Sequence, residues 1–495
     1  MKTLNVILKQ LSEEDYRDFY NSLQESSADK SSQLLKLARE HNYSDAEAIQ
    51  ILDVNPSAFY TLKFRLKQKI QEFVLQRLDI PQLELIKQVN NLPHLMYTQP
   101  REIALAVLKK LEKDLQGYDL PFELMRVYRA FKHLYFHTSD YYTYSQKYNQ
   151  YLAYTLAIDK AEDLVAEFSK TYSEYLLTRE SIAVEKMVTI KGELENVSRM
   201  YNSHRLYIYK SIVAIFFQLF VAPHYPHTAL DSDETIEEIL MKVDAIFDQY
   251  PNDPYYVHLE IIFNYLRFEY YRHYGILQKA HQYFEEINLQ FWHLIIHLST
   301  FVYAPQFLIS KVHYYQQLDN AAALYEENHP EDFQEKIQHV PDVSAIIIIK
   351  RYLAISCYHV KEYREAIRYL HQLRNEVSLK KYTVIDIEIK LFLALLYCLE
   401  NELELYKQIY STLKRQAKTV SEDFGEIINS FLKLTAVSIS GQASHREAKL
   451  LHALYRFNEL NQGPRRILDF IKTDREFIKL LMQPKVNPSN SNVDM

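Results

Sequence analysis

Apolar residues recur every three or four positions through the segment Ile347 to Leu373, and this spacing predicts two consecutive helices. In the first helix Leu353, Ala354 and Cys357 share one face, and the polar residues 359–362 make a turn. The second helix has an apolar stripe of its own: Tyr363, Ala366, Ile367, Leu370 and Leu373. We therefore predict an antiparallel helix pair whose apolar stripes meet.

The same pattern returns about forty residues further along the chain. In kind or in size, Lys350, Leu353, Ala354 and Tyr358 of the first helix are matched by Lys390, Leu393, Ala394 and Cys398. The apolar stripe of the second helix is matched by Leu403, Tyr406, Tyr410 and Leu413. One hairpin cannot bury its stripe alone, so neighbouring hairpins must stack. Looser versions of this unit elsewhere, including further helices through Ser421 to Met482, predict an array of helix pairs.

The two hairpins resemble the tetratricopeptide repeat (TPR). The small and large positions of that family are occupied by Leu353, Ala354, Cys357, Ala366, Leu370 and Leu373. The family prefers an aromatic residue at Cys357 and Leu370 and a small one at Leu373 and Tyr406, and its usual period is ~34 residues. The resemblance implies an all-α, right-handed α-solenoid of antiparallel helix hairpins that is TPR-like.

Composition supports an all-α chain. Six glycines among 495 residues are about 1%, against a typical ~7%, and prolines number 15. Tight turns between strands need residues that tolerate positive φ, and these are too few here for a sheet-rich fold. Proline-containing polar breaks then divide the chain as follows: a small N-terminal helical domain at 1–89, a linker at 90–100, helical repeats at 101–221, a loop at 222–234, repeats at 235–328, a break at 329–344, C-terminal TPR-like repeats at 345–482 and a disordered tail at 483–495.

A different pattern lies in the N-terminal domain. Ser44 or Asp45 can cap a helix that ends at Leu52, residues 53–55 form a tight turn, and Pro56 opens a second helix. This run resembles the helix-turn-helix that ends bacterial sigma factors, although that family prefers glycine where Asp53 stands.

The helix-turn-helix resemblance implies a nucleic-acid surface. Lys63 and Arg65 would meet phosphates while Ser57 and Tyr60 face base edges. The alternative is a structural hairpin with a solvated basic face. We count 12 Lys plus Arg against 13 Asp plus Glu over residues 1–89, which favours the structural interpretation.

Charge and cysteine usage narrow the class of protein. The net charge of −7 is spread without long runs, which argues against a general binder of nucleic acid or anionic membranes. Cys357 and Cys398 each lie inside an apolar helix, so we expect buried free thiols in a reducing cytoplasm, with a disulfide between them as the open alternative. The first residues lack the pattern of a signal peptide, so a cytoplasmic location is expected.

Three other segments admit two interpretations each. The uncharged stretch Ile287–Ser310 is long enough for a membrane span, but its polar residues favour a buried helix, a turn at Pro305 and the start of another helix. The tyrosine-rich stretch Phe131–Tyr154 favours packing over a ligand-stacking groove. Histidine pairs occur at 224/227 and at 293/297, without the further ligands that a zinc site needs.

The sequence lacks the residue patterns that several kinds of enzyme and nucleotide-binding site require. The two closest glycines, Gly425 and Gly441, are too far apart for a phosphate loop, a dinucleotide fingerprint or a nucleophile elbow. We predict no catalytic residue, no cofactor and no metal, and an active site assembled from distant residues is a weaker third hypothesis.

The leading functional hypothesis is a non-enzymatic scaffold that binds a protein or peptide on the concave face of the array. The first-helix positions that would face this groove are Arg351, Tyr352 and Ile355. Only Arg351 suits the carboxylate clamp of some TPR domains, so we expect an apolar groove, or one filled by another part of this chain. The alternative is a DNA-binding regulator that uses the helix-turn-helix and senses a partner through the array.

Overall fold

The computed structural model describes residues 4, 13–25, 29–40, 43–76, 81–201, 203–228, 234–251, 253–296, 301–327, 340, 342–439, 446–463 and 465–482. The prediction of an all-α chain is confirmed, because 84% of these residues are helical and none lies in a strand. The predicted tail at 483–495 lies outside them. The chain forms two compact units, Met1–Asp119 and Leu120–Met495, which we take separately.

The first unit contains two groups of helices. Helices α2 (Glu13–Glu25), α3 (Asp29–Glu40), α4 (Asp45–Leu52) and α5 (Pro56–Gln76) share a core that includes Phe19, Leu35 and Phe59. Helices α6 (Pro81–Asn90), α7 (Leu92–Thr98) and α8 (Arg101–Gly117) pack on one another. The expected linker at 90–100 thus contains a short helix, α7. A proline is tolerated in its first turn, because a backbone N–H at that position would have no partner within the helix.

The second unit is a succession of helices. In chain order they are α9 (Pro121–Leu134), α10 (Asp140–Thr178), α11 (Ser181–Met200), α12 (His204–Phe220), η1 (Ala222–His224), η2 (Pro226–Thr228), α13 (Ile236–Gln249), α14 (Pro254–His273), α15 (Leu277–Ile296), α16 (Gln306–Gln317), α17 (Ala323–Glu326), α19 (Val343–His359), α20 (Tyr363–Glu376), η3 (Leu379–Lys381), α21 (Thr383–Glu400), α22 (Leu403–Gln416), α23 (Glu422–Ile439), α24 (Arg446–Leu460) and α25 (Arg475–Met482).

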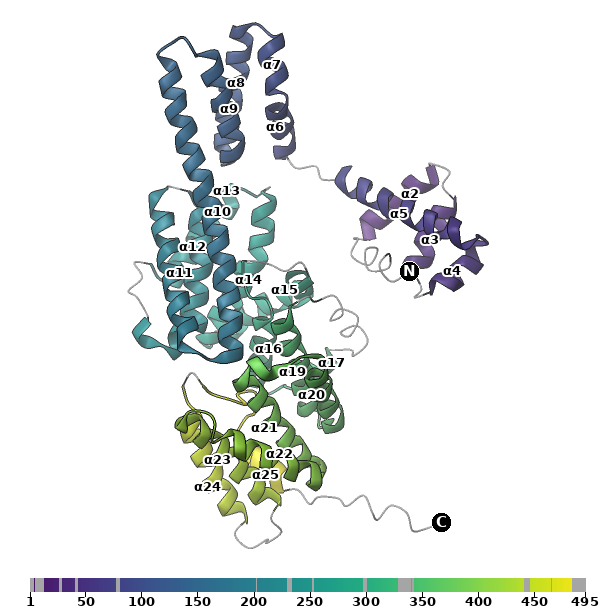
Figure 1. Ribbon diagram of the computed structural model, residues 1–495, viewed down its shortest axis with the longest axis vertical. Helices are drawn as coiled ribbons and strands as arrows, with labels where there is room; N and C mark the ends of the chain where they lie inside the picture. Colours follow the sequence, from purple (N-terminus) through teal and green to yellow (C-terminus); the bar gives the residue numbers. More distant parts are fainter. Residues whose placement is uncertain are drawn as a thin grey trace. The chain divides into compact units, whose positions relative to one another are not determined.

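Consecutive helices of this unit pack as pairs, most extensively α9 with α10, α14 with α15, α19 with α20, and α23 with α24 (Figure 1). Alternate helices also touch: α10 meets α12, α12 meets α14, α16 meets α19, and α21 meets α23. Helices α12, α19 and α21 are buried on nearly all sides, as expected for helices that are apolar all round. This arrangement is consistent with a helical repeat array.

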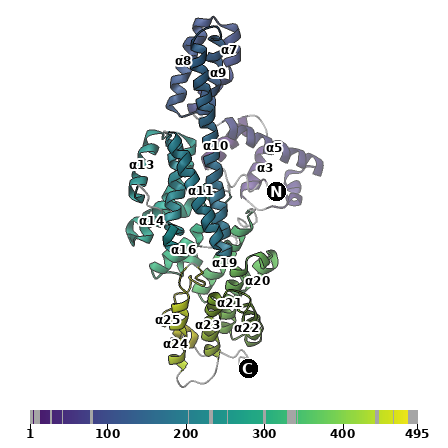
Figure 2. The same cartoon turned by 60° about the vertical axis from the view of Figure 1, so that its left-hand side comes forward.

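Both predicted hairpins are formed, by α19 with α20 and by α21 with α22, and Figure 2 shows them side by side. The small residues Ala354 and Ala366 are 0% exposed, which lets the paired helices approach. Cys357 and Cys398 are buried free thiols, so the disulfide alternative is wrong. Burial raises the pKa of the Cys357 thiol to about 12, which keeps this group protonated and inert.

The turns between paired helices repeat one backbone geometry. A residue with positive φ follows the first helix at Gly275, Asp319, Lys361 and Asn401. In each turn the N–H of the next residue donates to a carbonyl near the end of that helix: Ile276 to Tyr271 at 2.8 Å, Asn320 to Tyr315 at 3.0 Å, Glu362 to Cys357 at 2.9 Å and Glu402 to Tyr397 at 2.9 Å. These turns recur roughly every forty residues, the period of a two-helix repeat.

Changing Gly275 to Ala will lower the free energy of unfolding by about 1 kcal/mol, because its φ of 72° disfavours any residue with a Cβ. No atom lies within 4 Å of the added methyl group, so the loss comes from the backbone alone. The matched control is Gly192→Ala inside α11, where the space is also open and φ is helical. Urea titration will show a gain for Gly192→Ala, and equal effects of the two changes would contradict this view of the turns.

The tyrosine-rich segment packs α9 against α10. The ring of Tyr144 stacks on Phe131 at 4.2 Å and on Tyr135 at 5.3 Å between centroids, and Tyr128 meets Tyr151 at 5.2 Å. These contacts agree with the packing interpretation, since the rings that would stack on a ligand stack on one another.

Two apolar stretches lie in the second unit. Residues His204–His224 have the length and apolarity of a membrane span, and 61% of this window is buried inside the structure. The stretch Ile287–Ser310 contains the end of α15, and Pro305 stands as the N-cap of α16, as predicted for a helix, turn and helix. Residues 297–300 of this stretch lie outside the described ranges.

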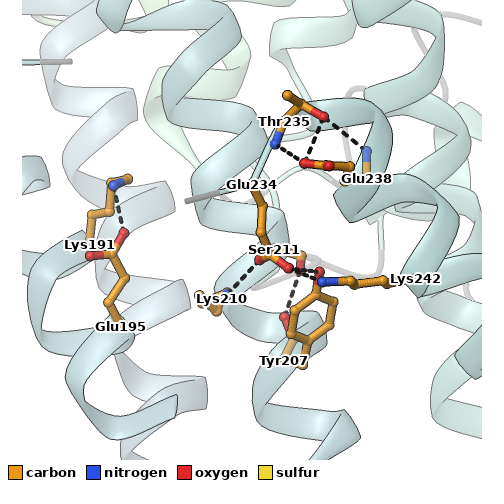
Figure 3. A network of polar contacts seen from close by, with 9 residues as sticks. All are labelled: Lys191, Glu195, Tyr207, Lys210, Ser211, Glu234, Thr235, Glu238 and Lys242. Atoms are coloured by element: carbon orange, nitrogen blue, oxygen red, sulfur yellow. Dashed lines mark hydrogen bonds and ion pairs between the residues drawn. The ribbon is translucent and has the colours of Figure 1, made fainter. Parts of the chain in front are cut away.

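A network of polar side chains links α12 to the start of α13 (Figure 3). The carboxylate of Glu234 accepts hydrogen bonds from Lys210 at 3.1 Å, from Tyr207 at 3.2 Å and from Lys242. Thr235 and Glu238 form a capping box that begins α13 beside it. Burial raises the pKa of Glu234, but the hydrogen bonds from the two lysines outweigh burial and lower the pKa overall.

The Glu234 network predicts a pH-dependent contribution to stability. Because the folded state lowers the pKa of Glu234, the contribution is present above the pKa of the unfolded chain and is lost as pH falls through the lowered value. Glu234→Gln will therefore cost about 1 kcal/mol at pH 7 and less at pH 3. The control is Glu260→Gln, at an exposed position of α14. A melting-temperature difference that stays constant between these pH values would contradict the assignment.

Candidate interaction groove

One non-helical segment stands out in the second unit. Residues 465–474, which we call the strap, connect α24 to α25 without forming the continuous helices expected there. The strap begins at an anchor in which the Asn461 amide accepts from the Ile467 N–H at 2.9 Å and donates to the Ile467 carbonyl at 2.8 Å. Asn458 holds the other end through Thr473. Side chains therefore replace the helical hydrogen bonds that this stretch of backbone lacks.

The strap lies on α16, α19 and α21. Its apolar residues are 1–3% exposed: Ile467, Leu468, Phe470 and Ile471. The ring of Phe470 meets Phe392 of α21 with 4.8 Å between centroids. The pocket around the strap is also lined by residues of α16 and α19, among them Leu308, Val312 and Ile348. About 30 Å³ remains beside the strap, room for roughly one water molecule.

The backbone of the strap is bound by side chains of two helices. The Leu468 N–H donates to Glu388 of α21 at 3.0 Å, and the side-chain amide of Gln316 in α16 donates to the Phe470 carbonyl. Outside this pocket, Lys472 pairs with Asp319 at the end of α16. The hydrogen bonds from Glu388 and Gln316 go to backbone atoms, so they do not depend on the side chains of the strap.

Titratable groups from four helices lie around Asp469 of the strap. Arg351 of α19 pairs with Glu388 at 2.9 Å, and His313 of α16 lies 3.5 Å from the Asp469 carboxylate. Arg179, which ends α10 with a φ of 56°, lines the same pocket. Burial raises the pKa of Asp469, but the hydrogen bond from His313 and the charges of Arg179 and Arg351 outweigh it and hold that pKa well below its ordinary value.

All three predicted groove residues lie in this pocket. Tyr352 is 2% and Ile355 is 6% exposed, and Arg351 is partly buried beside Glu388. The structure thus brings together Arg351, Tyr352 and Ile355 and places the chain's own strap over them. Sequence reasoning missed Arg179, His313, Glu388 and Asp469, which are scattered along the chain. The available signal was the glycine–proline pair at 463–464 followed by an apolar run around one aspartate.

The predicted helix, tight turn and second helix are formed by α4, residues 53–55 and α5. Ser44 caps α4 in a capping box with Glu47, Asp53 adopts a left-handed conformation with φ 48°, and Pro56 begins α5. The Asn55 side chain accepts from the Ala58 N–H at 2.7 Å and caps α5. Phe59, which is 0% exposed, packs the second helix onto the core.

The four predicted nucleic-acid residues differ in their surroundings. Ser57 and Arg65 are exposed, and Tyr60 is 55% exposed. Lys63 instead pairs with Asp45 of α4 at 3.0 Å. Three of the four side chains are therefore free to meet a ligand, and the ammonium group of Lys63 is already engaged.

Within the described ranges, no group of three or more His, Cys, Asp or Glu side chains is placed to hold a metal ion. The described part of the chain includes neither the side chains of His227 and His293 nor any atom of residue 297. No family model matches the chain, and no curated protein or solved structure matches it either.

Proposed function

We propose that this chain is a non-enzymatic interaction scaffold, built as a TPR-like, right-handed array, that binds a non-helical protein segment across α16, α19 and α21. One observation carries the proposal: this surface already holds a non-helical segment, the strap, through hydrogen bonds to its backbone, apolar contacts and the ion pair between Lys472 and Asp319. The inner face of a helical array offers such contacts to a bound chain segment.

Site-specific photo-crosslinking in the native cell tests the scaffold proposal. A photoreactive phenylalanine analogue replaces Leu318, which is 40% exposed at the end of α16, close to the strap contacts of Gln316 and Asp319. The matched control replaces Leu405, which is 42% exposed on α22. We expect a covalent adduct with a partner polypeptide at position 318 and none at 405. Equal adducts at both positions, or none at either, would contradict the proposal.

A second candidate function is DNA binding by the first unit, which is supported by two helices that are joined by a tight turn at Asp53 and by the exposure of Ser57, Tyr60 and Arg65 on the second of them. An electrophoretic shift assay of the full chain across salt concentrations tests it. If Arg65 meets a phosphate, Arg65→Ala weakens binding to all sequences and lowers the salt slope by about 1. Absence of any shift at low salt would remove this candidate.

A further inference from the structure

The groove under the strap has a charge imbalance of its own. Without the strap its fixed charges are Arg179 and Arg351 against Glu388, with His313 beside them. Asp469 of the strap supplies the second negative charge. Without Asp469, the partly buried guanidinium groups of Arg179 and Arg351 share one carboxylate, and charges partly removed from water are costly without a partner. Any segment that occupies the groove must therefore bring an acidic side chain to this point.

The groove also fixes the residues on either side of that acid. The residue before it has its N–H bound by Glu388 and an apolar side chain, as Leu468 has. The residue after it has its carbonyl bound by Gln316 and a ring against Phe392, as Phe470 has. The matching motif is an aliphatic residue, an acid and an aromatic residue in a turn, because the Ile471 N–H donates to the Leu468 carbonyl at 3.0 Å.

The strap itself is not an ideal occupant of the groove. Leu468 has a φ of 55°, a left-handed conformation that costs a residue with a Cβ about 1–2 kcal/mol. An unconnected peptide with the same motif is free of the geometry that α24 and α25 impose on the strap ends. The strap nevertheless has the advantage of being tethered at both ends, which gives it a high effective concentration.

We propose that the strap is an internal stand-in for the partner, and that the partner is a protein segment with an aliphatic–acidic–aromatic motif that displaces the strap from the groove. This proposal rests on the scaffold function above and specifies its ligand. Wild-type protein binds such a segment weakly because the strap competes, and any change that weakens the strap alone strengthens binding.

Fluorescence anisotropy with the full chain tests the displacement. The probe is a dye-labelled peptide with the sequence of residues 465–474, RRILDFIKTD, and the control peptide has Lys in place of its Asp. Two variants weaken the strap: the mild Asp469→Asn and the stronger double change Asp469→Ala with Phe470→Ala. The control variant is Phe477→Ala in α25, which removes a ring that is 3% exposed outside the groove. Circular dichroism confirms that each variant is folded.

We expect the dissociation constant of the probe to fall at least tenfold from wild type to the double variant, with Asp469→Asn between them. Phe477→Ala should bind like wild type, and the Lys peptide should bind none of the proteins. If the double variant does not fold, the affinity of the Asp469→Asn variant for the probe, compared with that of wild type, is the test. Equal affinity for wild type and strap variants would overturn displacement and leave the scaffold function standing. If the probe does not bind a folded strap variant, the proposed motif is overturned. The scaffold function is tested separately, by the photo-crosslinking at positions 318 and 405.

Discussion

Replacing Glu388 with Ala will lower the free energy of unfolding of the second unit by about 3–5 kcal/mol. Glu388 is 5% exposed, pairs with Arg351 at 2.9 Å and accepts the Leu468 N–H at 3.0 Å. Its removal takes these partners from a guanidinium and a backbone N–H that are both largely shielded from water, and the loss of such partners is more costly than the pair is stabilising.

A double substitution separates the cost of leaving Arg351 without its partner from the cost of losing the packing of the Glu388 side chain. Arg351→Leu combined with Glu388→Leu removes both charges, so it should cost less than Glu388→Ala alone. The control is Glu404→Ala on α22, whose side chain is 80% exposed beside Lys407 and should cost under about 0.5 kcal/mol. Urea unfolding followed by circular dichroism measures all three. A cost for Glu388→Ala no larger than that of Glu404→Ala would show that the strap is not anchored as described.

Replacing Phe284 with Ala will lower the free energy of unfolding by about 3–5 kcal/mol. Phe284 of α15 is 1% exposed and lies 4.7 Å from the Tyr314 ring, 5.5 Å from Phe268 and 5.9 Å from Phe307, measured between centroids. This aromatic cluster joins α14, α15 and α16, so its loss opens a cavity where successive helix pairs meet.

The matched control for Phe284 lies on the same helix. Leu289 is 85% exposed, so Leu289→Ala should change stability by no more than about 0.5 kcal/mol. Thermal and urea unfolding of the two variants give the comparison. Similar melting temperatures for both would mean that α15 does not pack on the array as described.

The elements that could be predicted from the sequence are those whose signal is local. The hairpin from Ile347 to Leu373 follows from its apolar spacing, and α4 and α5 follow from the cap at Ser44 and from Pro56. The repeated turn was hidden, because its left-handed position is filled by Gly275, Asp319, Lys361 and Asn401. Glycine is the strongest sequence signal of positive φ, Asp and Asn are weaker ones, and Lys gives none.

The candidate groove could be predicted only in part. Its floor at Arg351, Tyr352 and Ile355 follows from the register of one helix, but its charges come from α10, α16, α21 and the strap. No periodicity links residues so far apart, so their meeting is a property of tertiary packing. The position of the strap agrees with the expectation that another part of the chain fills the groove. The non-helical conformation of the strap was not predicted, because apolar spacing alone indicates further helices in this region.

Hydrogen–deuterium exchange of the full chain, with and without a saturating amount of the RRILDFIKTD peptide, tests the groove most directly. We expect amides of residues 467–471 to exchange faster when the peptide is bound, because the strap leaves its hydrogen bonds to Glu388 and Gln316. Amides of α19 should stay protected, because the peptide takes the place of the strap. If saturating peptide leaves the exchange of residues 467–471 unchanged or slower, the strap does not yield the groove and the account is contradicted.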